Sequence, residues 1–470
     1  MSSYLAFDLG ASSGRAILGR FDGQRITMHE VHRFATPTIV EGERLYWNLE
    51  EVWTALQEGL RRALAVEPDL RSLSIDSWGV DYVPMDRAMA PLRRAHVYRD
   101  PRTNGMEAVA RALITEDALY GATGIRSLFI NTLFQVLADR ELTPAVFDNT
   151  RCRLLVADYF NWRFCGHPTA EVSLASTTQL LDPVTQDWSV AVMRTLGIDP
   201  ETWPGVVPSG TVLGPVDWAQ NVMVIAGCSH DTACAVAAVP VVEETSWAYL
   251  SSGTWSLLGV EQRVPLCTPA ARAAGFTNEI GYGGTIRLLK NLTGLWVLQE
   301  CERVWREAGQ SFDYDTLLHE AESAKPVSTF IDFNEPVFST RGDMPRRIAN
   351  WCIANGAAVP EDRGAYVRLI LESLAEMYRT TLADLESLLG KEVKVLHVVG
   401  GGSRNTLLNQ WTANRCRCNV IAGPAEATAL GNLLVQASTM GDLPAGTSLR
   451  MVAARSADLK TFRPTQSAGS

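Results

Sequence analysis

The 470-residue sequence lacks several patterns that would assign it to a common functional class. Its nine cysteines include no CxxC pair and no zinc-type spacing with histidine, so no zinc site or disulfide framework is predicted. The GxxxxGK(S/T) pattern of P-loop proteins does not occur, and the first strand–turn segment lacks the GxGxxG pattern of dinucleotide-binding folds. No apolar run has the length of a membrane span, because the best one, CAVAAVPVV, is short and contains Pro240.

The chain also lacks an excess of positive charge, since 42 Lys and Arg residues stand against 52 Asp and Glu residues and the formal net charge is −10. This balance argues against a surface that binds nucleic acid or anionic lipid. The first residues, MSSYLAFDLG, lack a basic segment and run directly into a strand pattern, so we expect no signal peptide. Together with cysteines that we expect to be reduced, Cys416 and Cys418 included, this predicts a cytoplasmic protein.

What is present is the composition of a folded chain, with 46% hydrophobic and 20% charged residues. The length predicts two large domains, and alternating strand and helix patterns predict α/β layers. We expect the boundary within residues 236–246, which gives domains 1–240 and 241–470. The pattern strand, Ser/Gly turn, strand occurs at the start of both halves, which favours an internal duplication.

Two helices are predicted with particular clarity. Val52, Leu56, Leu60 and Leu64 fall on one face of a helix that follows the first strands. A longer apolar stripe begins at Val367 and runs to Leu389, and the next residue, Gly390, is a typical helix stop.

The segment from Asp8 to Arg15 carries the first chemical pattern, a tight turn after a strand. Backbone amides and serine hydroxyls in such a turn can approach phosphate oxygens, and an acid at the strand end can bind Mg²⁺. An ordinary hairpin with an exposed aspartate would give the same pattern. The turn at Ser251–Thr254 and the glycines 400–402 are further small-residue loops that suit a nucleotide.

Asp231 stands in the polar stretch Ser229–Thr232, within an apolar background. A carboxylate at that position suits a general base, although it could equally cap the helix that follows. For His230 we favour a hydrogen-bonded core histidine over a metal ligand.

Polar candidates for sugar contacts follow along the chain. Trp78 offers an indole that could stack on a sugar, and Gly79 permits close approach of the backbone. The amides of Asn291 and Gln299 can both donate to and accept from hydroxyl groups. The loop from Arg99 to Arg102 fits either a substrate loop or a solvated turn, and the former is slightly favoured.

Nine segments in order carry a family resemblance: AFDLGASSGR, SIDSWGVDY, YRDPRTNG, FINTLFQ, CSHDTACAV, LSSGTWSL, KNLTGLWVLQ, HVVGGGSRNTLLNQ and AGPAEATALGN. From residue 4 to about residue 440 the chain resembles the FGGY carbohydrate kinases. The resemblance implies a two-lobed actin/Hsp70-like ATPase fold, with duplicated ribonuclease H-like lobes and ATP in the cleft between them.

The same resemblance implies roles for individual residues. Asp231 corresponds to the proton acceptor, and Asp8 to the acidic residue near Mg²⁺. The residues implied at ATP are Ala11, Ser12, Ser13, Gly14, Arg15, Thr254, Gln299 and Gly401. The residues implied at the sugar are Gly79, His230, Asp231, Thr232 and Asn291.

The expected reaction is phosphoryl transfer from Mg·ATP to a ketose, with L-rhamnulose giving its 1-phosphate. The stretch YWNLEE, Cys234 and Thr293 depart from the family pattern and leave the ketose open, so L-fuculose and xylulose stay alternatives. Another class, an actin-like nucleotide-binding protein without a sugar acceptor, is disfavoured by the polar residues around Asp231. The expected partners are small molecules, and the chain is expected to be a monomer or homodimer.

Overall fold

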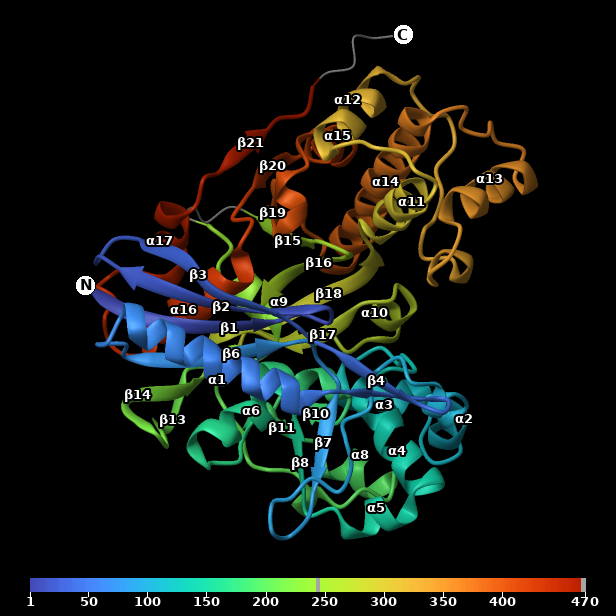
Figure 1. Ribbon diagram of the computed structural model, residues 1–470. Coiled ribbons are helices and arrows are strands. Elements are labelled where there is room, and N and C mark those ends of the chain that lie inside the picture. The colour runs from blue at the N-terminus through green and yellow to red at the C-terminus, as the bar shows by residue number, and fades with distance from the viewer. Residues whose placement is uncertain (242–245, 466–470) are drawn as a thin grey trace. The chain divides into compact units, whose positions relative to one another are not determined.

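The computed structural model describes residues 1–241 and 246–465, which form two compact units (Figure 1). Unit 1 comprises Met1–Val242, Glu261–Leu288 and Ala427–Ala457, and unit 2 comprises Glu243–Val260, Leu289–Glu426 and Asp458–Ser470. Part of the predicted boundary segment, residues 242–245, lies outside the described residues. The division into domains 1–240 and 241–470 therefore stays a prediction.

Unit 1 is built on a sheet whose strands run in the order β13-β14-β6-β1-β2-β3. β1 pairs antiparallel with β2 and parallel with β6, and β14 is parallel to β6. The strands are β1 (Ser2–Leu9), β2 (Ser13–Phe21), β3 (Ile26–Ala35), β6 (Ser72–Ser77), β13 (Thr211–Val216) and β14 (Ala219–Ala226). The turn predicted within Asp8–Arg15 is confirmed, because residues 10–12 join β1 to β2.

Strand β6 shows how the sheet divides its two faces. Leu73 and Ile75 lie in the large hydrophobic core, whereas Ser72 and Asp76 bond to helix α16 (Ala427–Thr439) on the other face. Because side chains alternate along a strand, the sequence SLSIDS places apolar groups on one face and polar groups on the other.

Helices cover both faces of this sheet. On the apolar face, Gly59 of α1 (Leu49–Val66) lies against Phe7, whose ring stacks on Phe164 of α6 (Val156–Cys165). On the opposite face, Gly19 of β2 leaves room for Leu433 of α16, because a Cβ there would lie 2.6 Å from that side chain. The predicted stripe of α1 is buried at Val52, Leu56 and Leu60, and Leu64 is partly buried.

The remaining elements of unit 1 are short. Its small sheets pair β4 (Thr38–Glu41) with β5 (Arg44–Trp47), β7 (Tyr82–Met85) with β8 (Cys152–Leu155), β9 (Ala170–Glu171) with β12 (Val206–Val207), and β10 (Leu181–Asp182) with β11 (Asp187–Trp188). β17 (Thr277–Ile280) also belongs to this unit. The other helices are α2 (Met106–Arg111), α3 (Glu116–Thr123), α4 (Thr132–Leu142), α5 (Pro144–Asn149), α7 (Val172–Ala175), α8 (Val190–Thr195), α9 (Asp231–Ala237), α10 (Pro269–Ala273) and α17 (Leu449–Ser456).

Unit 2 has a sheet in which the strands run β18-β16-β15-β19-β20-β21. Their bounds are β15 (Trp247–Ser252), β16 (Trp255–Gln262), β18 (Ile286–Thr293), β19 (Val395–Val399), β20 (Asn419–Ala422) and β21 (Lys460–Phe462). Its helices are α11 (Trp296–Glu307), α12 (Tyr314–Ser323), α13 (Met344–Ala354), α14 (Arg363–Leu389) and α15 (Thr406–Cys416).

The two sheets repeat one topology. β15 pairs antiparallel with β16 and parallel with β19, as β1 does with β2 and β6. β20 is then parallel to β19 and antiparallel to β21, as β14 is to β6 and β13. The repeat predicted from two similar hairpins is therefore confirmed at the level of strand topology.

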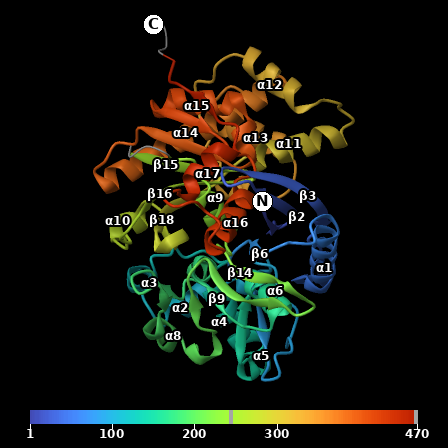
Figure 2. The ribbon, with the colours of Figure 1, turned by 90° about the vertical axis from the view of Figure 1, so that its left-hand side faces the viewer.

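The long helix α14 lies beside α15 (Figure 2). The side chain of Asp362 accepts a hydrogen bond from the Ala365 amide and caps its first turn. Gly390 ends the helix in the left-handed conformation with a φ of 62°, as predicted. In the chain that the structure describes, no helix is long and apolar enough to cross a membrane.

Candidate functional site

The β1–β2 turn presents backbone and hydroxyl groups at the carboxyl end of β1. The Gly10 amide donates to the Ser13 carbonyl at 3.0 Å, which closes the turn. Ala11 and Ser12 are exposed at its tip, so their polar groups can meet a ligand. Gly14, in contrast, is buried, and a Cβ at this position would lie 2.4 Å from the Phe34 ring. Packing against β3 therefore explains this glycine.

Asp8 begins a group of carboxylates at this edge of the unit 1 sheet. It forms an ion pair with Arg15 at 2.5 Å, and its Cα faces that of Asp76 across the β1–β6 pairing. Next to β6, the Ser77 amide donates to the Ser229 carbonyl at 2.9 Å, which brings the segment before α9 to the same edge. Asp8, Asp76 and Asp231 therefore approach one another from three neighbouring segments.

Asp76 is the buried member of this group. Its Oδ2 accepts a hydrogen bond from Asn432 Nδ2 at 2.7 Å. Burial, followed by the negative charge of Asp8, raises the pKa of the Asp76 carboxyl well above its usual range. A bound cation would relieve this crowding of negative charge, and carboxylate oxygens are ligands that Mg²⁺ accepts.

The segment that contains Asp231 is anchored by two side chains of unit 1. The Ser229 amide donates to Glu171 Oε2 at 2.9 Å, and the His230 amide donates to Ser173 Oγ at 3.2 Å. Asp231 is the first residue of α9 and His230 is its N-cap residue, so the expectation that Asp231 caps the helix is wrong by one position. The anchored backbone places the Asp231 side chain at the start of α9.

The carboxylate of Asp231 is bound mainly through one oxygen. Oδ1 accepts from the Thr232 amide at 2.5 Å and from the Thr232 hydroxyl at 3.1 Å. It also lies 3.3 Å from Nε2 of His230, a residue that is only 8% exposed. His230 is thus the hydrogen-bonded core histidine that was favoured from sequence. Within the described ranges 1–241 and 246–465, no cluster of three or more His, Cys, Asp or Glu residues is arranged to hold a metal ion.

Gly79 lies directly after β6, against Thr177. A Cβ on Gly79 would lie 2.8 Å from the Thr177 hydroxyl, which accepts from the Val80 amide at 3.1 Å. The neighbouring Trp78 is buried, and its ring centroid lies 4.2 Å from that of Trp47. The expectation that Trp78 stacks on a sugar is therefore wrong, because the indole is part of the core.

Asp81 is a buried carboxylate whose surroundings were not foreseen from sequence. Its Oδ2 accepts from the indole nitrogens of Trp47 and Trp78, at 2.7 and 3.0 Å, and its Oδ1 accepts from Gln135 at 2.8 Å. Burial raises its pKa to about 6, against the opposing effect of these hydrogen bonds. In the sequence, only the short spacing of Trp78 and Asp81 could have indicated this contact. The other partners of Asp81, Trp47 and Gln135, come from distant segments.

The loop from Arg99 to Arg102 is not a solvated turn. Asp100 is 1% exposed and accepts from the amides of Leu45 and Arg102. Arg102 is buried and bonds to Asp139 at 2.7 Å, whereas Arg99 is exposed. Two of the three charged residues therefore stabilise unit 1 from within.

Unit 2 brings together two of the predicted ATP residues. Thr254 Oγ1 donates to Gln299 Oε1 at 3.2 Å, and both residues are exposed. The Thr254 carbonyl accepts from the Trp296 amide at 3.1 Å, so the β15–β16 turn is joined to the start of α11. Asn291, the predicted sugar residue of this unit, is exposed on β18.

The glycines after β19 lie against the end of β15. A Cβ on Gly402 would lie 2.0 Å from Ser252 Oγ, and one on Gly400 would lie 2.9 Å from the Ser252 carbonyl. Gly401 is exposed, with open space where a Cβ would be. A short 3-10 turn, Gly401–Arg404, precedes α15.

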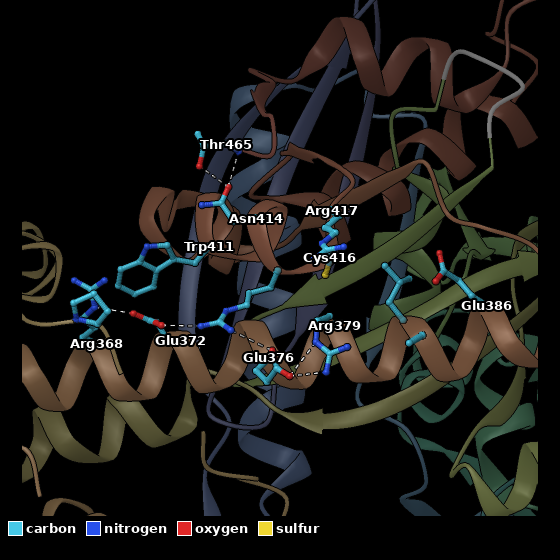
Figure 3. Close-up of a pocket in the computed structure, with 14 residues that line it drawn as sticks. Arg368, Glu372, Glu376, Arg379, Glu386, Trp411, Asn414, Cys416, Arg417 and Thr465 are labelled. Carbon is cyan, nitrogen blue, oxygen red and sulfur yellow. Dashed lines mark hydrogen bonds and ion pairs between the residues drawn. The ribbon is translucent and has the colours of Figure 1, made fainter. Parts of the chain in front are cut away.

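A separate cavity of about 870 Å³ in unit 2 lies over α14 and the end of α15 (Figure 3). Its charged groups largely bind one another: Arg368 pairs with Glu372 at 2.7 Å, and Arg415 pairs with the same carboxylate at 3.0 Å. Among the described residues that line it, none is a predicted site residue. This cavity is therefore not part of the candidate site.

Comparison with known proteins shows the family of the chain. The model of the FGGY family of carbohydrate kinases, N-terminal domain, matches residues 3–238, and that of the C-terminal domain matches residues 248–440. The chain is 38% identical to the rhamnulokinase of Bacteroides thetaiotaomicron over 469 residues, covering 98% of this chain and 96% of that protein. It is 36% identical to the rhamnulokinase of Halalkalibacterium halodurans, covering 98% and 99%.

Solved structures share the fold at low sequence identity. A ligand-bound xylulose kinase from Lactobacillus acidophilus gives a TM-score of 0.79 at 16% identity, covering 99% of this chain and 94% of that one. Glycerol kinase from Plasmodium falciparum, with ADP, gives 0.80 at 17% identity with the same coverage.

Proposed function

Because this chain belongs to the FGGY family of carbohydrate kinases, we propose that it transfers the γ-phosphoryl group of ATP to O1 of L-rhamnulose, giving L-rhamnulose 1-phosphate and ADP. The observation that carries the proposal is that the segment with Asp231 and the β1–β2 turn lie at the same edge of the unit 1 sheet. The similarity to two proteins named rhamnulokinase, over nearly the whole chain, supports the choice of sugar.

Asp231 is the proposed general base. Its Oδ2 would accept the proton of the sugar hydroxyl while that hydroxyl oxygen forms a bond to the γ-phosphorus. The bond from the γ-phosphorus to the β,γ-bridging oxygen breaks, and ADP leaves. The bonds from Thr232 to Oδ1 would hold the carboxylate in one orientation during this step.

In unit 1, the turn of residues Ala11–Arg15 is proposed to contact the phosphates of ATP. Its amide and hydroxyl donors, with the Arg15 guanidinium, would stabilise charge on the transferring phosphoryl group. In unit 2, Thr254, Gln299 and Gly401 are likewise proposed to contact ATP. The proposed sugar contacts are Gly79, His230 and Thr232 in unit 1 and Asn291 in unit 2, because backbone, hydroxyl and amide groups suit sugar hydroxyls.

Mg²⁺ fits the carboxylates at this edge of the unit 1 sheet. Asp8 is the proposed contact, directly or through water, and Asp76 is the residue that faces it across the β1–β6 pairing. The remaining ligands would be phosphate oxygens and water, as is usual for Mg²⁺. When bound, the ion would supply positive charge beside the phosphate oxygens.

A ketose panel tests the proposal. ADP release by the purified chain is measured with L-rhamnulose, L-fuculose, D-xylulose and no sugar, with the Asp231→Asn variant as a control for contaminating kinases. We expect the highest kcat/KM with L-rhamnulose. A higher value with another ketose would contradict the substrate, and ADP release that no sugar alters would favour an actin-like nucleotide-binding protein.

We also propose a reducing compartment, the cytoplasm, where ATP is abundant. The nine cysteines are all free, which is typical of proteins kept reduced. The proposed partners are accordingly small molecules, and a monomer or homodimer stays a prediction.

A further inference from the structure

A buried ion pair lies behind His230 within unit 1. Arg287 is 0% exposed and lies in the first part of β18, which belongs to unit 1 because that unit extends to Leu288. Its Nη2 lies 2.9 Å from Oε2 of Glu279 on β17. Arg287 Nε also donates to the Ile280 carbonyl at 3.3 Å. Burying two charges is costly even when they are paired, so a structural role alone does not account well for this pair.

Both members of the pair reach the imidazole of His230. Arg287 Nη2 lies 3.1 Å from His230 Nδ1, and Glu279 Oε2 lies 3.3 Å from the same nitrogen. The other ring nitrogen, Nε2, lies 3.3 Å from Asp231 Oδ1. The ring therefore connects the buried pair to the proposed base.

The chemistry of these groups selects one neutral tautomer. Arginine is always protonated and can only donate, so a bond from Arg287 to Nδ1 requires a lone pair on Nδ1. The proton is then on Nε2, where it can be donated to Asp231 Oδ1. In the other tautomer, Nδ1–H could donate to Glu279 Oε2, but it would also face an N–H of Arg287, and the Nε2 lone pair would face Asp231 Oδ1. These two unfavourable contacts outweigh the one favourable contact.

We propose that Arg287 and Glu279 are positioning residues that hold His230 with its proton on Nε2, so that this proton fixes Oδ1 of Asp231 and leaves Oδ2 to receive the proton of the sugar hydroxyl. The inference rests on the proposed role of Asp231 as the base. It assigns to Glu279 the orientation of the guanidinium, and to Arg287 the bond to the ring.

The state of Glu279 agrees with this arrangement. Burial alone would raise its pKa, but the charge of Arg287 lowers it to about 2. An ionised Glu279 balances the charge of Arg287, so the guanidinium can face the ring without placing a net positive charge there.

The oxygens of Asp231 then have separate tasks. Oδ1 receives donors from the Thr232 amide, the Thr232 hydroxyl and the His230 ring. Among the described residues, no hydrogen bond to Oδ2 is present, and the side chain is 35% exposed. Loss of the ring proton would remove one of the three donors and let the carboxylate rotate.

Nitrogen NMR of the sugar-free protein tests the tautomer without using activity. Ring nitrogens are labelled in the seven histidines, and the His230 signals are assigned by their loss in His230→Gln. At about pH 8, where histidine is ordinarily neutral, we expect a protonated Nε2 and an unprotonated Nδ1 in the wild type. A protonated Nδ1 in the wild type would overturn the proposal.

The paired variant Glu279→Gln/Arg287→Gln removes both charges together and so avoids leaving one buried charge alone. We expect a mixture of His230 tautomers in this variant. The matched control is Glu261→Gln/Arg450→Gln, which removes another ion pair of unit 1. The control should keep the wild-type tautomer, and a wild-type His230 spectrum in the paired variant would refute the inference.

Steady-state kinetics give a second, independent readout. The paired variant should lose about 10- to 100-fold in kcat, with the KM for ATP unchanged, because a misplaced base slows the chemical step. On a His230→Gln background the same paired change should cost nothing further, since the pair acts through the ring. Equal losses on both backgrounds would show a merely structural role and sink the proposal.

The two hypotheses fail separately in these experiments. If Asp231→Asn keeps normal turnover, the role of Asp231 as the base is wrong whatever the NMR result. If Asp231→Asn is inactive but the paired variant keeps full kcat, only the positioning role is wrong. If the paired variant does not fold, Arg287→Lys takes its place. This variant keeps the charge and should retain the wild-type tautomer. A mixture of tautomers in it would count against the positioning role.

Discussion

The two carboxylate oxygens of Asp231 differ in their surroundings. Oδ1 is held by Thr232 and faces His230, whereas the side chain as a whole is partly exposed. An aspartate with one anchored oxygen can accept a proton on the other without losing its orientation. The carboxylate, rather than any hydroxyl nearby, is therefore the group whose loss should stop the reaction.

We expect Asp231→Asn to lose on the order of 10²–10⁴-fold in kcat, because an amide cannot take the hydroxyl proton. Sugar affinity, measured by isothermal titration calorimetry, should change little, since the amide keeps the size and hydrogen-bonding capacity of the side chain. Near-normal turnover in this variant would remove Asp231 from the role of base.

His96 illustrates how burial alters a titrating group elsewhere in unit 1. It is 5% exposed, and burial together with the charges of Arg102 and Arg93 lowers its pKa from 6.5 to about 2. Asp100 Oδ2 lies 3.5 Å from its Nδ1, but that oxygen already accepts from the Leu45 amide at 2.5 Å. The folded protein therefore holds His96 neutral.

This shift predicts a pH dependence of stability. Below pH 6.5 the unfolded chain binds a proton at His96 that the folded chain does not, so His96 lowers the free energy of unfolding as the pH falls from 6.5 towards 2. The contribution is roughly 1.4 kcal/mol for each pH unit. In urea titrations between about pH 5 and 7, His96→Gln should show a shallower pH dependence than the wild type. His319 is exposed, so His319→Gln should show the same pH dependence as the wild type. The prediction would be refuted if His96→Gln also showed the pH dependence of the wild type.

At the level of helices, strands and loops, the positions of the loops were predicted better than the contacts that stabilise them. The stop of α14 at Gly390 and the turn after Leu9 follow from local chemistry, and both are confirmed. The glycine loop after β19 was predicted as a small-residue loop that suits a nucleotide. Its close packing against Ser252 depends on the neighbouring strand β15, which the sequence does not place.

We therefore expect the substitution of glycine by alanine to have different effects at Gly402 and at Gly401. Gly402→Ala should lower the melting temperature, because its Cβ would lie 2.0 Å from Ser252 Oγ and 3.0 Å from the Ser252 carbonyl, so the loop must move. It should also raise the KM for ATP if the loop binds ATP. Gly401→Ala, with open space at its Cβ, serves as the stability control and should melt with the wild type. Equal melting temperatures for both variants would contradict this account.

At the scale of the whole molecule, the C-terminal segment of unit 1 stabilises its first strands. Gln436 bonds to Ser72 and to the Leu5 carbonyl, and Asn432 bonds to Asp76. These partners are more than 350 positions apart in the chain. The buried polar face of the sheet is therefore satisfied only when α16 is in place.

We expect Asn432→Ala to lower the free energy of unfolding by about 1–3 kcal/mol, because it leaves the buried Asp76 carboxyl without its amide donor. The urea midpoint, followed by tryptophan fluorescence, measures the loss. Asn419→Ala, at an exposed position on β20, is the matched control and should be within about 0.5 kcal/mol of the wild type. A similar midpoint for the two variants would contradict the role of Asn432.

Much of the fold could be predicted because its signals are local. A strand needs alternation and a helix needs a period near 3.6, and both are present in the residues themselves, as in β6 and α1. The family resemblance named Asp8, near the end of β1, and Asp231, at the start of α9, together with the small-residue loops. The prediction for Trp78 was wrong, because an indole can stack on a sugar but this one packs against Trp47.

Local patterns in the amino-acid sequence were enough to predict the turn after Asp8, the long helix that ends before Gly390, and the carboxylates next to small-residue turns. The contacts of Asp8 with Asp76, of Asn432 with Asp76, and of Arg287 and Glu279 with His230 could be found only in the folded chain. The partners in these contacts are far apart along the chain. Backbone and periodicity signals act over a few residues, whereas the field around a buried carboxylate is set by groups that meet only after the sheet has formed.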